Sequence, residues 1–217
     1  TSDVLSKNVD LVVWPETTLG LISNGKVPIS LQVMFLNYDT LLLAGGFGTG
    51  VVDGVKRTYS SAFLIDQNIV SGRYDKIKLL PFAEYSPSAF FDDFRSRVNG
   101  FSDLSAGSDN VVFDLKGVSF GSLICYDILF PELARNLILN GASFLVNISN
   151  EAWFENDFER KQHFDIVKFR SIESRRYIAR ASNKGISGFI SPTGSVLDSI
   201  DVSQPDYVVG DVIPYIG

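Results

Sequence analysis

The sequence predicts a layered α/β protein, and three observations support this. Short apolar runs typical of β-strands recur through the 217 residues and are separated by glycine, asparagine, aspartate and proline. Helical patterns lie between some of these runs, as in proteins whose sheets are covered by helices. The length suits one large domain, and 45% hydrophobic with 20% charged residues is an ordinary globular composition. We therefore expect a single domain over residues 1–217.

The predicted strands are runs rich in valine, isoleucine, leucine and phenylalanine. In chain order they span residues 11–14, 41–45, 59–65, 111–115, 118–124, 143–148, 177–182, 186–191 and 207–212. Residues 113–120 have the pattern of a β-hairpin, with Lys116 and Gly117 at its turn. We expect strands to alternate with helices in the first half of the chain and hairpins to prevail in the second.

Helices are expected at residues 29–37, 131–140 and about 160–175, and residues 3–7 have the pattern of a helix tail. The helix at 131–140 is the clearest. Pro131 suits the first helical position, Glu132 complements the helix dipole and Gly141 provides a left-handed stop. The apolar residues of the last helix spread around its axis, so we expect neighbours to cover it on more than one side.

Composition and charge exclude several classes of protein and site. Nineteen basic against 25 acidic residues give a net charge of −6, which argues against a nucleic-acid groove. A single cysteine excludes an internal disulfide, and a single histidine excludes a histidine-rich metal site, so we expect no metal. The sequence has neither an apolar run long enough to cross a bilayer nor a signal-peptide pattern. Because it opens without methionine in a helix-like segment, we take it as an excerpt from a longer protein.

Cys125 is the first candidate for chemistry. It stands at the end of the predicted strand 118–124 and shortly before the helix at Pro131, and nucleophiles commonly sit at such strand-to-helix turns. The alternative is a buried cysteine that serves only as a small hydrophobic residue. The single histidine, His163, lies far along the chain, so a Cys–His dyad stays open but has no local support.

Charged residues near other apolar runs offer a second way to activate a thiol. Glu16 follows the run 11–14, and Glu84 follows a stretch that contains Lys76 and Lys78. The two lysines would share one face of a strand, so alternation cannot separate them. Each charge alone is normally a solvated surface group, but a site that buried carboxylate and lysine beside the cysteine could work without histidine.

Three motifs together resemble a known family. They are Trp14-Pro15-Glu16, then Tyr74-Asp75-Lys76 with Leu79-Leu80-Pro81-Phe82-Ala83-Glu84-Tyr85, then Ile124-Cys125-Tyr126-Asp127. Their order and spacing resemble the Glu–Lys–Cys signatures of the nitrilase, or carbon–nitrogen hydrolase, superfamily. With residues 147–154, 162–163 and 170–188, the chain looks most like the catalytic domain of the bacterial apolipoprotein N-acyltransferase family. The resemblance covers about residues 9–198.

The resemblance implies a four-layer αββα sandwich and a catalytic role for each motif. Cys125 would be the nucleophile, and Glu16 the general base that takes its proton. Lys76 would stabilise the tetrahedral oxyanion together with the backbone N–H of Tyr126.

Further residues would support this machinery. Glu84 would orient Lys76 or the incoming amine, and its spacing of eight residues from Lys76 selects this lysine over Lys78. Asp127 would be a second supporting carboxylate. These acyltransferases usually have glutamate at that position, whereas aspartate is commoner in soluble amidases. Aromatic side chains, in part from the loop 85–110, are expected to bind substrate, namely Phe82, Phe90, Phe91 and Trp153.

The implied reaction is a two-step acyl transfer without metal or organic cofactor. Cys125 would take a fatty acyl chain from a phospholipid as a thioester. It would then pass the chain to the α-amino group of the diacylglyceryl-cysteine at an apolipoprotein N-terminus. The domain would face the periplasm at the bacterial inner membrane, carried by membrane-spanning segments that are missing here, as is the first strand of the fold. A soluble amidase with the same residues is the alternative, and a non-catalytic binding module is a third hypothesis.

Overall fold

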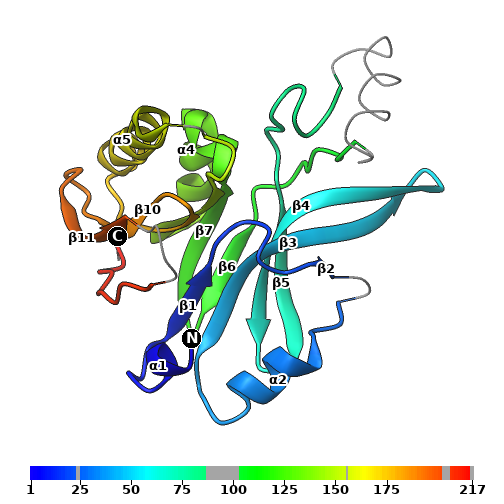
Figure 1. The fold of residues 1–217 in the computed structure, drawn as a ribbon, viewed down its shortest axis with the longest axis horizontal. Helices are drawn as coiled ribbons and strands as arrows, with labels where there is room; N and C mark the ends of the chain where they lie inside the picture. Colours follow the sequence, from blue (N-terminus) through cyan, green and yellow to red (C-terminus); the bar gives the residue numbers. More distant parts are fainter. Residues whose placement is uncertain (23–24, 87–102, 155, 202–205, 216–217) are drawn as a thin grey trace.

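Two mixed β-sheets pack face to face and helices cover both outer faces, so the chain forms the expected four-layer αββα sandwich (Figure 1). The computed structural model describes residues 1–22, 25–86, 103–154, 156–201 and 206–215. The strands of the first sheet are β1 (Leu11–Trp14), β2 (Leu21–Ile22), β3 (Leu41–Val52), β4 (Val55–Asp66) and β5 (Ile69–Asp75). Those of the second are β6 (Val112–Leu115), β7 (Val118–Ile124), β8 (Phe144–Asn150), β9 (Ile178–Asn183), β10 (Ile186–Ile190) and β11 (Val196–Asp201). The helices are α1 (Ser2–Leu5), α2 (Ile29–Phe35), α4 (Pro131–Leu139), α5 (Asp157–Ser174) and the 3₁₀ helix η1 (Cys125–Leu129).

A long antiparallel hairpin forms the centre of the first sheet. β3 and β4 pair along almost their whole length, and Asp53 and Gly54 at the turn both have positive φ, 52° and 77°, as tight hairpin turns favour. β1 joins β3 in parallel, and β5 pairs with the other side of β4. Buried residues of α1 and α2 pack on the outer face of this sheet.

The second sheet combines a hairpin with a parallel centre. The predicted hairpin is confirmed, because β6 pairs antiparallel with β7 and the turn residues Lys116 and Gly117 have φ of 52° and 89°. β7, β8 and β9 are parallel, and α4 and α5 connect them on the outer face. α4 begins at Pro131 and is followed by Gly141 with φ of 97°, as the sequence predicts.

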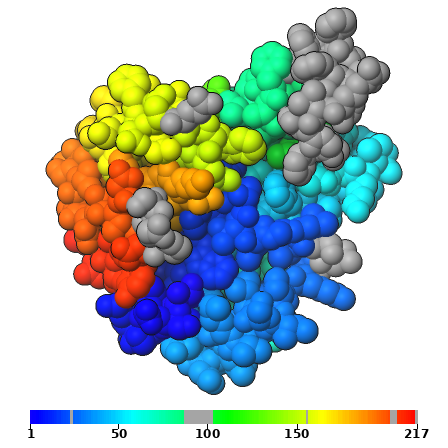
Figure 2. All heavy atoms as spheres, in the orientation of Figure 1, coloured from blue at the N-terminus to red at the C-terminus, as the bar shows by residue number. Residues whose placement is uncertain are grey.

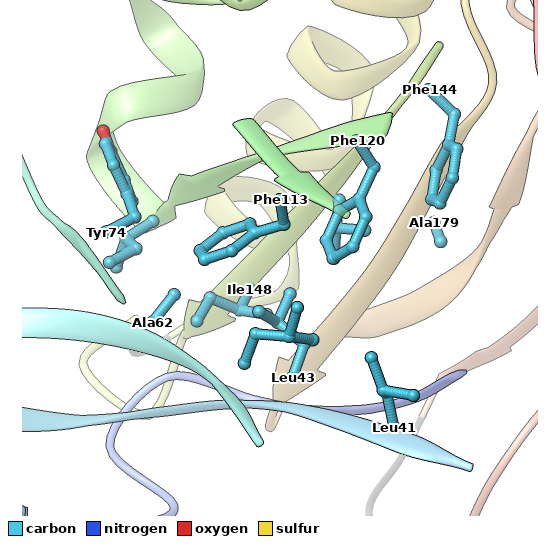
Figure 3. Packing of buried hydrophobic residues seen from close by; sticks show 12 residues of the cluster. Leu41, Leu43, Ala62, Tyr74, Phe113, Phe120, Phe144, Ile148 and Ala179 are labelled. Carbon is cyan, nitrogen blue, oxygen red and sulfur yellow. The ribbon is translucent and has the colours of Figure 1, made fainter. Parts of the chain in front are cut away.

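The core between the sheets is aromatic at its centre (Figure 3). The ring of Phe120 stacks on that of Phe144 with centroids 5.2 Å apart, and the centroid of Phe113 lies 5.3 Å from that of Phe120. Tyr74 of β5 belongs to the same cluster, but Figure 3 shows its hydroxyl directed away from the other rings. This packing fixes β5 against β7, and therefore fixes the positions of the two strand ends relative to each other.

Segments far apart in the sequence meet along one face of the molecule. In Figure 2 the N-terminal segment (blue) lies between the C-terminal strands (orange) and the β3–β4 arm (cyan). β1 of the first sheet contacts β9 of the second. The residues that follow β1 are therefore brought to the ends of the parallel strands of the other sheet.

The structure corrects several predicted elements. The antiparallel hairpins prevail in the first half and the strand–helix alternation in the second, the reverse of our expectation. β2, β5 and β11 are missing from the predicted set because they are very short or lie at sheet edges, where exposed positions break the apolar pattern. Residues 207–212 form no strand, and the described residues 206–215 contain no regular element. The tail is held by a hydrogen bond from the Tyr215 N–H to the Ser143 carbonyl at 3.2 Å and by the Arg176 guanidinium, 3.9 Å from the centroid of the Tyr215 ring.

The prediction for the helix at 160–175 is also wrong in one respect. The buried residues of α5 lie on one face, and its opposite face carries Phe169 and Ile172, which are 60% and 47% exposed. Within the described residues, α5 is therefore covered on one side. Among all the residues that the structure describes, no helix combines the length and the apolar character needed to cross a membrane.

Candidate active site

Cys125 stands on a strained turn between β7 and η1. It is the first residue of η1, and its φ of 45° lies in the left-handed region, which is uncommon for a residue other than glycine. A sharp turn of this kind directs a side chain out of the sheet edge, as the strand-to-helix turns of known nucleophiles do. The geometry thus gives Cys125 the position that the sequence predicts for a nucleophile.

Asp127 holds this turn in shape. Its buried carboxylate accepts hydrogen bonds from the backbone N–H of Ile124 at 3.1 Å and from that of Lys78 at 2.8 Å. The Tyr74 hydroxyl donates a third bond, at 2.8 Å. Burial raises the pKa of Asp127 to about 6, although nearby Lys76 and these donors act to lower it. Asp127 therefore connects the end of β7 to the segment after β5.

Lys76 lies at the centre of the site. It directly follows β5, its side chain is only 2% exposed, and its Nζ lies 3.2 Å from Glu16 Oε1 and 2.6 Å from Glu84 Oε1. Burial alone would lower the pKa of Lys76, but Glu16, Cys125 and Glu84 raise it above the usual range. The lysine is therefore a fixed cation between two carboxylates.

Each carboxylate is held by a second contact. Glu16 is buried, and its Oε2 accepts a hydrogen bond from the backbone N–H of Asn150 at 3.0 Å, which links β1 to the end of β8. Glu84 Oε2 accepts one from the N–H of Leu80 at 2.7 Å. Gly45 permits the close approach, since a Cβ there would lie 2.5 Å from the Cα of Glu16. Backbone N–H groups thus help to position both carboxylates beside Lys76, and the Ser60 hydroxyl adds a hydrogen bond to Glu16 Oε1 at 3.3 Å.

The electrostatics keep the resting thiol protonated. Burial and the negative charge of Glu16 raise the pKa of Cys125 to about 11, although Lys76, Ser149 and Arg180 act to lower it. At neutral pH the sulfur can act as a nucleophile only if a base takes its proton. Glu16 is a buried carboxylate whose charge acts on both Cys125 and Lys76, and it remains the predicted base.

The structure separates the two lysines that the sequence could not. β5 ends at Asp75, so Lys76 and Lys78 both lie beyond the strand. The expectation that they share one face of a strand is wrong. The Lys78 ammonium points to the surface, 3.4 Å from Glu132 and 4.7 Å from the centroid of the Phe130 ring. Only Lys76 reaches the two carboxylates.

A buried charged network behind the site was not predicted. The side chains of Glu151 and Arg180 are both 0% exposed and form an ion pair. His163 Nδ1 lies 2.5 Å from Glu151 Oε1, and the backbone of Cys125 acts to raise the pKa of the ring. Arg180 pairs in turn with the side-chain oxygen of Asn147. The single histidine thus supports the turn of Cys125 from behind, and burial, with Arg180, lowers its pKa.

Sequence reasoning had only weak signals for this network. Glu151 follows a predicted strand, as Glu16 does, which could have marked it as a site residue. Arg180 lies in an apolar run, where a charge normally needs a partner, but nothing in the sequence identifies that partner. Among the described residues, no group of three or more histidine, cysteine, aspartate or glutamate side chains could hold a metal ion.

A cleft of 960 Å³ opens beside the turn that carries Cys125. Its walls include Tyr126 and Phe130 next to the turn, and Arg57 and Arg73 further out. Two expected substrate-binding aromatics, Phe82 and Trp153, are 62% and 77% exposed and do not line it. The other two, Phe90 and Phe91, lie outside the described residues.

Comparison with known proteins agrees with this geometry. The model of the family described as carbon-nitrogen hydrolase matches residues 2–213. Three proteins named as apolipoprotein N-acyltransferases are similar over most of the chain. The protein from Pseudomonas paraeruginosa is 30% identical over 97% of the chain, that from Geobacter metallireducens 33% over 94%, and that from Treponema pallidum 38% over 94%. The chain spans only 42%, 40% and 42% of the lengths of these relatives.

Solved structures share the fold at low sequence identity. Nit3 from Saccharomyces cerevisiae, a member of the nitrilase superfamily, superposes with a TM-score of 0.69 at 19% identity and covers 91% of the chain and 75% of its own. A nitrilase-superfamily amidase from Nesterenkonia gives a TM-score of 0.66 at 17% identity and covers 93% of the chain and 77% of its own. At these identities the likeness supports the four-layer sandwich alone.

Proposed function

The chain belongs to the carbon–nitrogen hydrolase family, and we propose that it is the catalytic domain of an apolipoprotein N-acyltransferase. The observation that carries the proposal is the convergence of Glu16, Lys76, Glu84 and Cys125 at one end of the two sheets. The similarity to apolipoprotein N-acyltransferases over nearly the whole chain supports the choice of this branch of the family.

The first half of the reaction forms a thioester. Glu16 takes the proton of Cys125, and the sulfur attacks the ester carbonyl of a phospholipid. The ammonium of Lys76 and the backbone N–H of Tyr126 stabilise the oxyanion, and preorganised donors of this kind contribute about 3 kcal/mol each. When the tetrahedral intermediate collapses, the lysophospholipid oxygen leaves with the proton from Glu16, and the acyl chain stays on sulfur.

The second half transfers the acyl chain to an amine. The α-amino group of a diacylglyceryl-cysteine attacks the thioester, and the same two donors stabilise the second oxyanion. The nitrogen loses a proton to carboxylate and Cys125 recovers its own, so the products are an amide and the free thiol. Glu84 lies 2.6 Å from Lys76 and keeps the ammonium in place through both steps.

The cleft and the exposed aromatics suit large lipid substrates. The volume of 960 Å³ lies at the upper end for ligand pockets, and the walls combine aromatic, cationic and acidic side chains. Tyr126 of the Cys125 turn lines this cleft, whereas Cys125 itself does not. Phe82 and Trp153 on the surface are candidates for contact with acyl chains. We place the domain at the periplasmic side of a bacterial inner membrane, with phospholipid as donor and diacylglyceryl-apolipoprotein as acceptor. The chemistry needs no cofactor.

The acyl-enzyme itself tests the proposal. The full-length protein incubated with phospholipid alone should gain one fatty-acyl mass on the peptide that contains Cys125, and hydroxylamine should remove it. Cys125→Ala should abolish the adduct. Glu84→Gln should slow the reaction, whereas Glu132→Gln, an exposed carboxylate outside the site, should not.

Two results would defeat this assignment. One is an acyl mass on another residue. The other is the absence of an adduct under conditions in which lipoprotein acylation proceeds. A protein that hydrolyses small amides and forms no adduct from phospholipid would be an amidase of the same family.

A further inference from the structure

A buried hydroxyl with no hydrogen-bond acceptor lies behind the nucleophile. Ser149 on β8 is 0% exposed, and among the described residues its Oγ meets no partner at hydrogen-bonding geometry. Burying an unpaired hydroxyl costs free energy, and such groups in folded proteins call for an explanation. The catalytic roles given above to Glu16, Lys76 and Glu84 leave Ser149 without a function.

The strand register brings Ser149 to Cys125. β7 and β8 are parallel, and their last pair is Ile124 with Ile148, so the next residue of each chain lies at the same sheet edge. Ile148 packs in the core between the sheets, and Ser149, the next residue along, therefore faces the opposite side. Cys125 and Ser149 each follow one residue of this last pair and are therefore neighbours, and Ser149 acts to lower the pKa of the Cys125 thiol, as a hydroxyl close to the sulfur would.

We propose that Ser149 donates a hydrogen bond to the Cys125 thiolate and so stabilises the sulfur anion during acyl transfer. A neutral thiol is a weak acceptor, and in the resting site the Ser149 hydroxyl meets no partner at hydrogen-bonding geometry among the described residues. A thiolate is a strong acceptor, and hydrogen bonds to charged groups are about twice as strong as neutral ones. The hydroxyl thus favours the ionised sulfur, both as the proton leaves it during attack and when the thioester is cleaved. This inference rests on Cys125 being the nucleophile.

Other charged groups also act on the sulfur, and they stay constant across the test. Glu16 faces it from the segment after β1, Lys76 from the end of β5 and Arg180 from β9. Asp127 in η1 accepts the backbone N–H of Ile124, the residue before Cys125, and His163 in α5 interacts with the backbone of Cys125. Substitution of Ser149 leaves all five in place, so a change in thiol reactivity reports the hydroxyl.

The experiment measures alkylation of Cys125 by iodoacetamide in the full-length protein at pH 8, followed by mass spectrometry of the Cys125 peptide. Alkylation needs the thiolate but forms no oxyanion, so it isolates the effect of Ser149 on sulfur. Ser149→Ala should slow alkylation about tenfold or more, as expected for the loss of a hydrogen bond to an anion. Ser122→Ala is the matched control, since Ser122 is equally buried and unpaired but faces the core between the sheets, and it should keep the parent rate.

A second pair of variants guards against effects of packing. Ser149→Thr keeps the hydroxyl, and Ser149→Val has the shape of threonine without the hydroxyl. Cys125 should therefore be alkylated about tenfold faster in Ser149→Thr than in Ser149→Val. Equal rates in both comparisons, for Ser149→Ala against parent and for Thr against Val, would overturn the inference. If no acyl-enzyme forms on Cys125, the proposed function fails, but the alkylation rates still decide the role of Ser149. If the acyl-enzyme forms and the rates are equal, only the role of Ser149 fails.

Discussion

Replacing Glu151 by glutamine should destabilise the protein strongly, because it leaves Arg180 buried without its counter-charge. Both side chains are 0% exposed, and His163 is only 7% exposed, so water cannot solvate the arginine that remains. Burial would raise the pKa of Glu151, yet its contacts with His163 and Arg180 lower it overall, which shows that the carboxylate is ionised at neutral pH. The substitution thus removes a full charge from the interior.

The expected loss is about 3–5 kcal/mol, the usual cost of removing one partner of a buried ion pair. In a protein of this size each kcal/mol lowers the melting temperature by about 2–4 °C, so the variant should melt about 6–20 °C lower. Arg180→Met should cost a similar amount. The double variant should cost less than the sum by at least about 1 kcal/mol, because neither charge is then left alone.

Thermal unfolding of the full-length protein and its three variants measures this coupling. Lys168→Met is the control, since Lys168 forms an exposed pair with Asp165 on α5, at 2.7 Å, and such pairs contribute about 0–1 kcal/mol. The difference between parent and Glu151→Gln should shrink as pH falls, because a carboxylate with a lowered pKa gives stability that is lost on protonation. Additive effects below about 1 kcal/mol for each variant would refute the reasoning and show that water reaches the network.

Two further predictions concern the lysine and the turn. Lys76→Met should slow formation of the acyl-enzyme about 10²–10³-fold in single-turnover assays, whereas Lys78→Met should leave the rate near that of the parent; equal losses would contradict the assignment. Burial raises the pKa of Asp127 to about 6 in the folded protein, against about 3.9 in unfolded chains, so its contribution to stability is complete below about pH 4 and is lost as pH rises through about 6. Melting temperatures of Asp127→Asn should lack this fall, and parallel pH profiles of parent and variant would show the raised pKa to be wrong.

Much of the fold could be predicted from the apolar runs, and three site residues could be predicted because each follows a strand, whereas Glu84 follows none and was selected by the family resemblance. Glu16, Lys76 and Cys125 come directly after or just beyond β1, β5 and β7, and strand ends gather at one edge of a layered protein. The choice between Lys76 and Lys78 could not be made from the alternation of side chains along a strand, because β5 ends at Asp75 and neither lysine belongs to it. Exposed edge strands were missed for a related reason, since their apolar pattern is interrupted on the solvent side.

The buried network could not be predicted because its partners are distant in sequence. Glu151 meets His163 across 12 residues and Arg180 across 29, and only the packing of α5 against β8 and β9 brings them together. Single charges in a sequence are normally assigned to the surface. The burial of Ser149 can be predicted from its apolar strand, but only the structure shows that its hydroxyl has no hydrogen-bond partner among the described residues.

The charges of the site explain why a base is needed and not merely a cation. Lys76 contributes one positive charge, and Glu16 and Glu84 contribute two negative ones, so ionisation of Cys125 would add a third anion to a buried cluster. Burial first, and then the negative charge of Glu16, raise the pKa of the thiol to about 11, although Lys76 acts to lower it. A proton that moves only from sulfur to Glu16 leaves the total charge of the site unchanged. Under the proposed mechanism we therefore expect the proton to move during attack and not to leave a standing thiolate, so the same proton is then available to the leaving group.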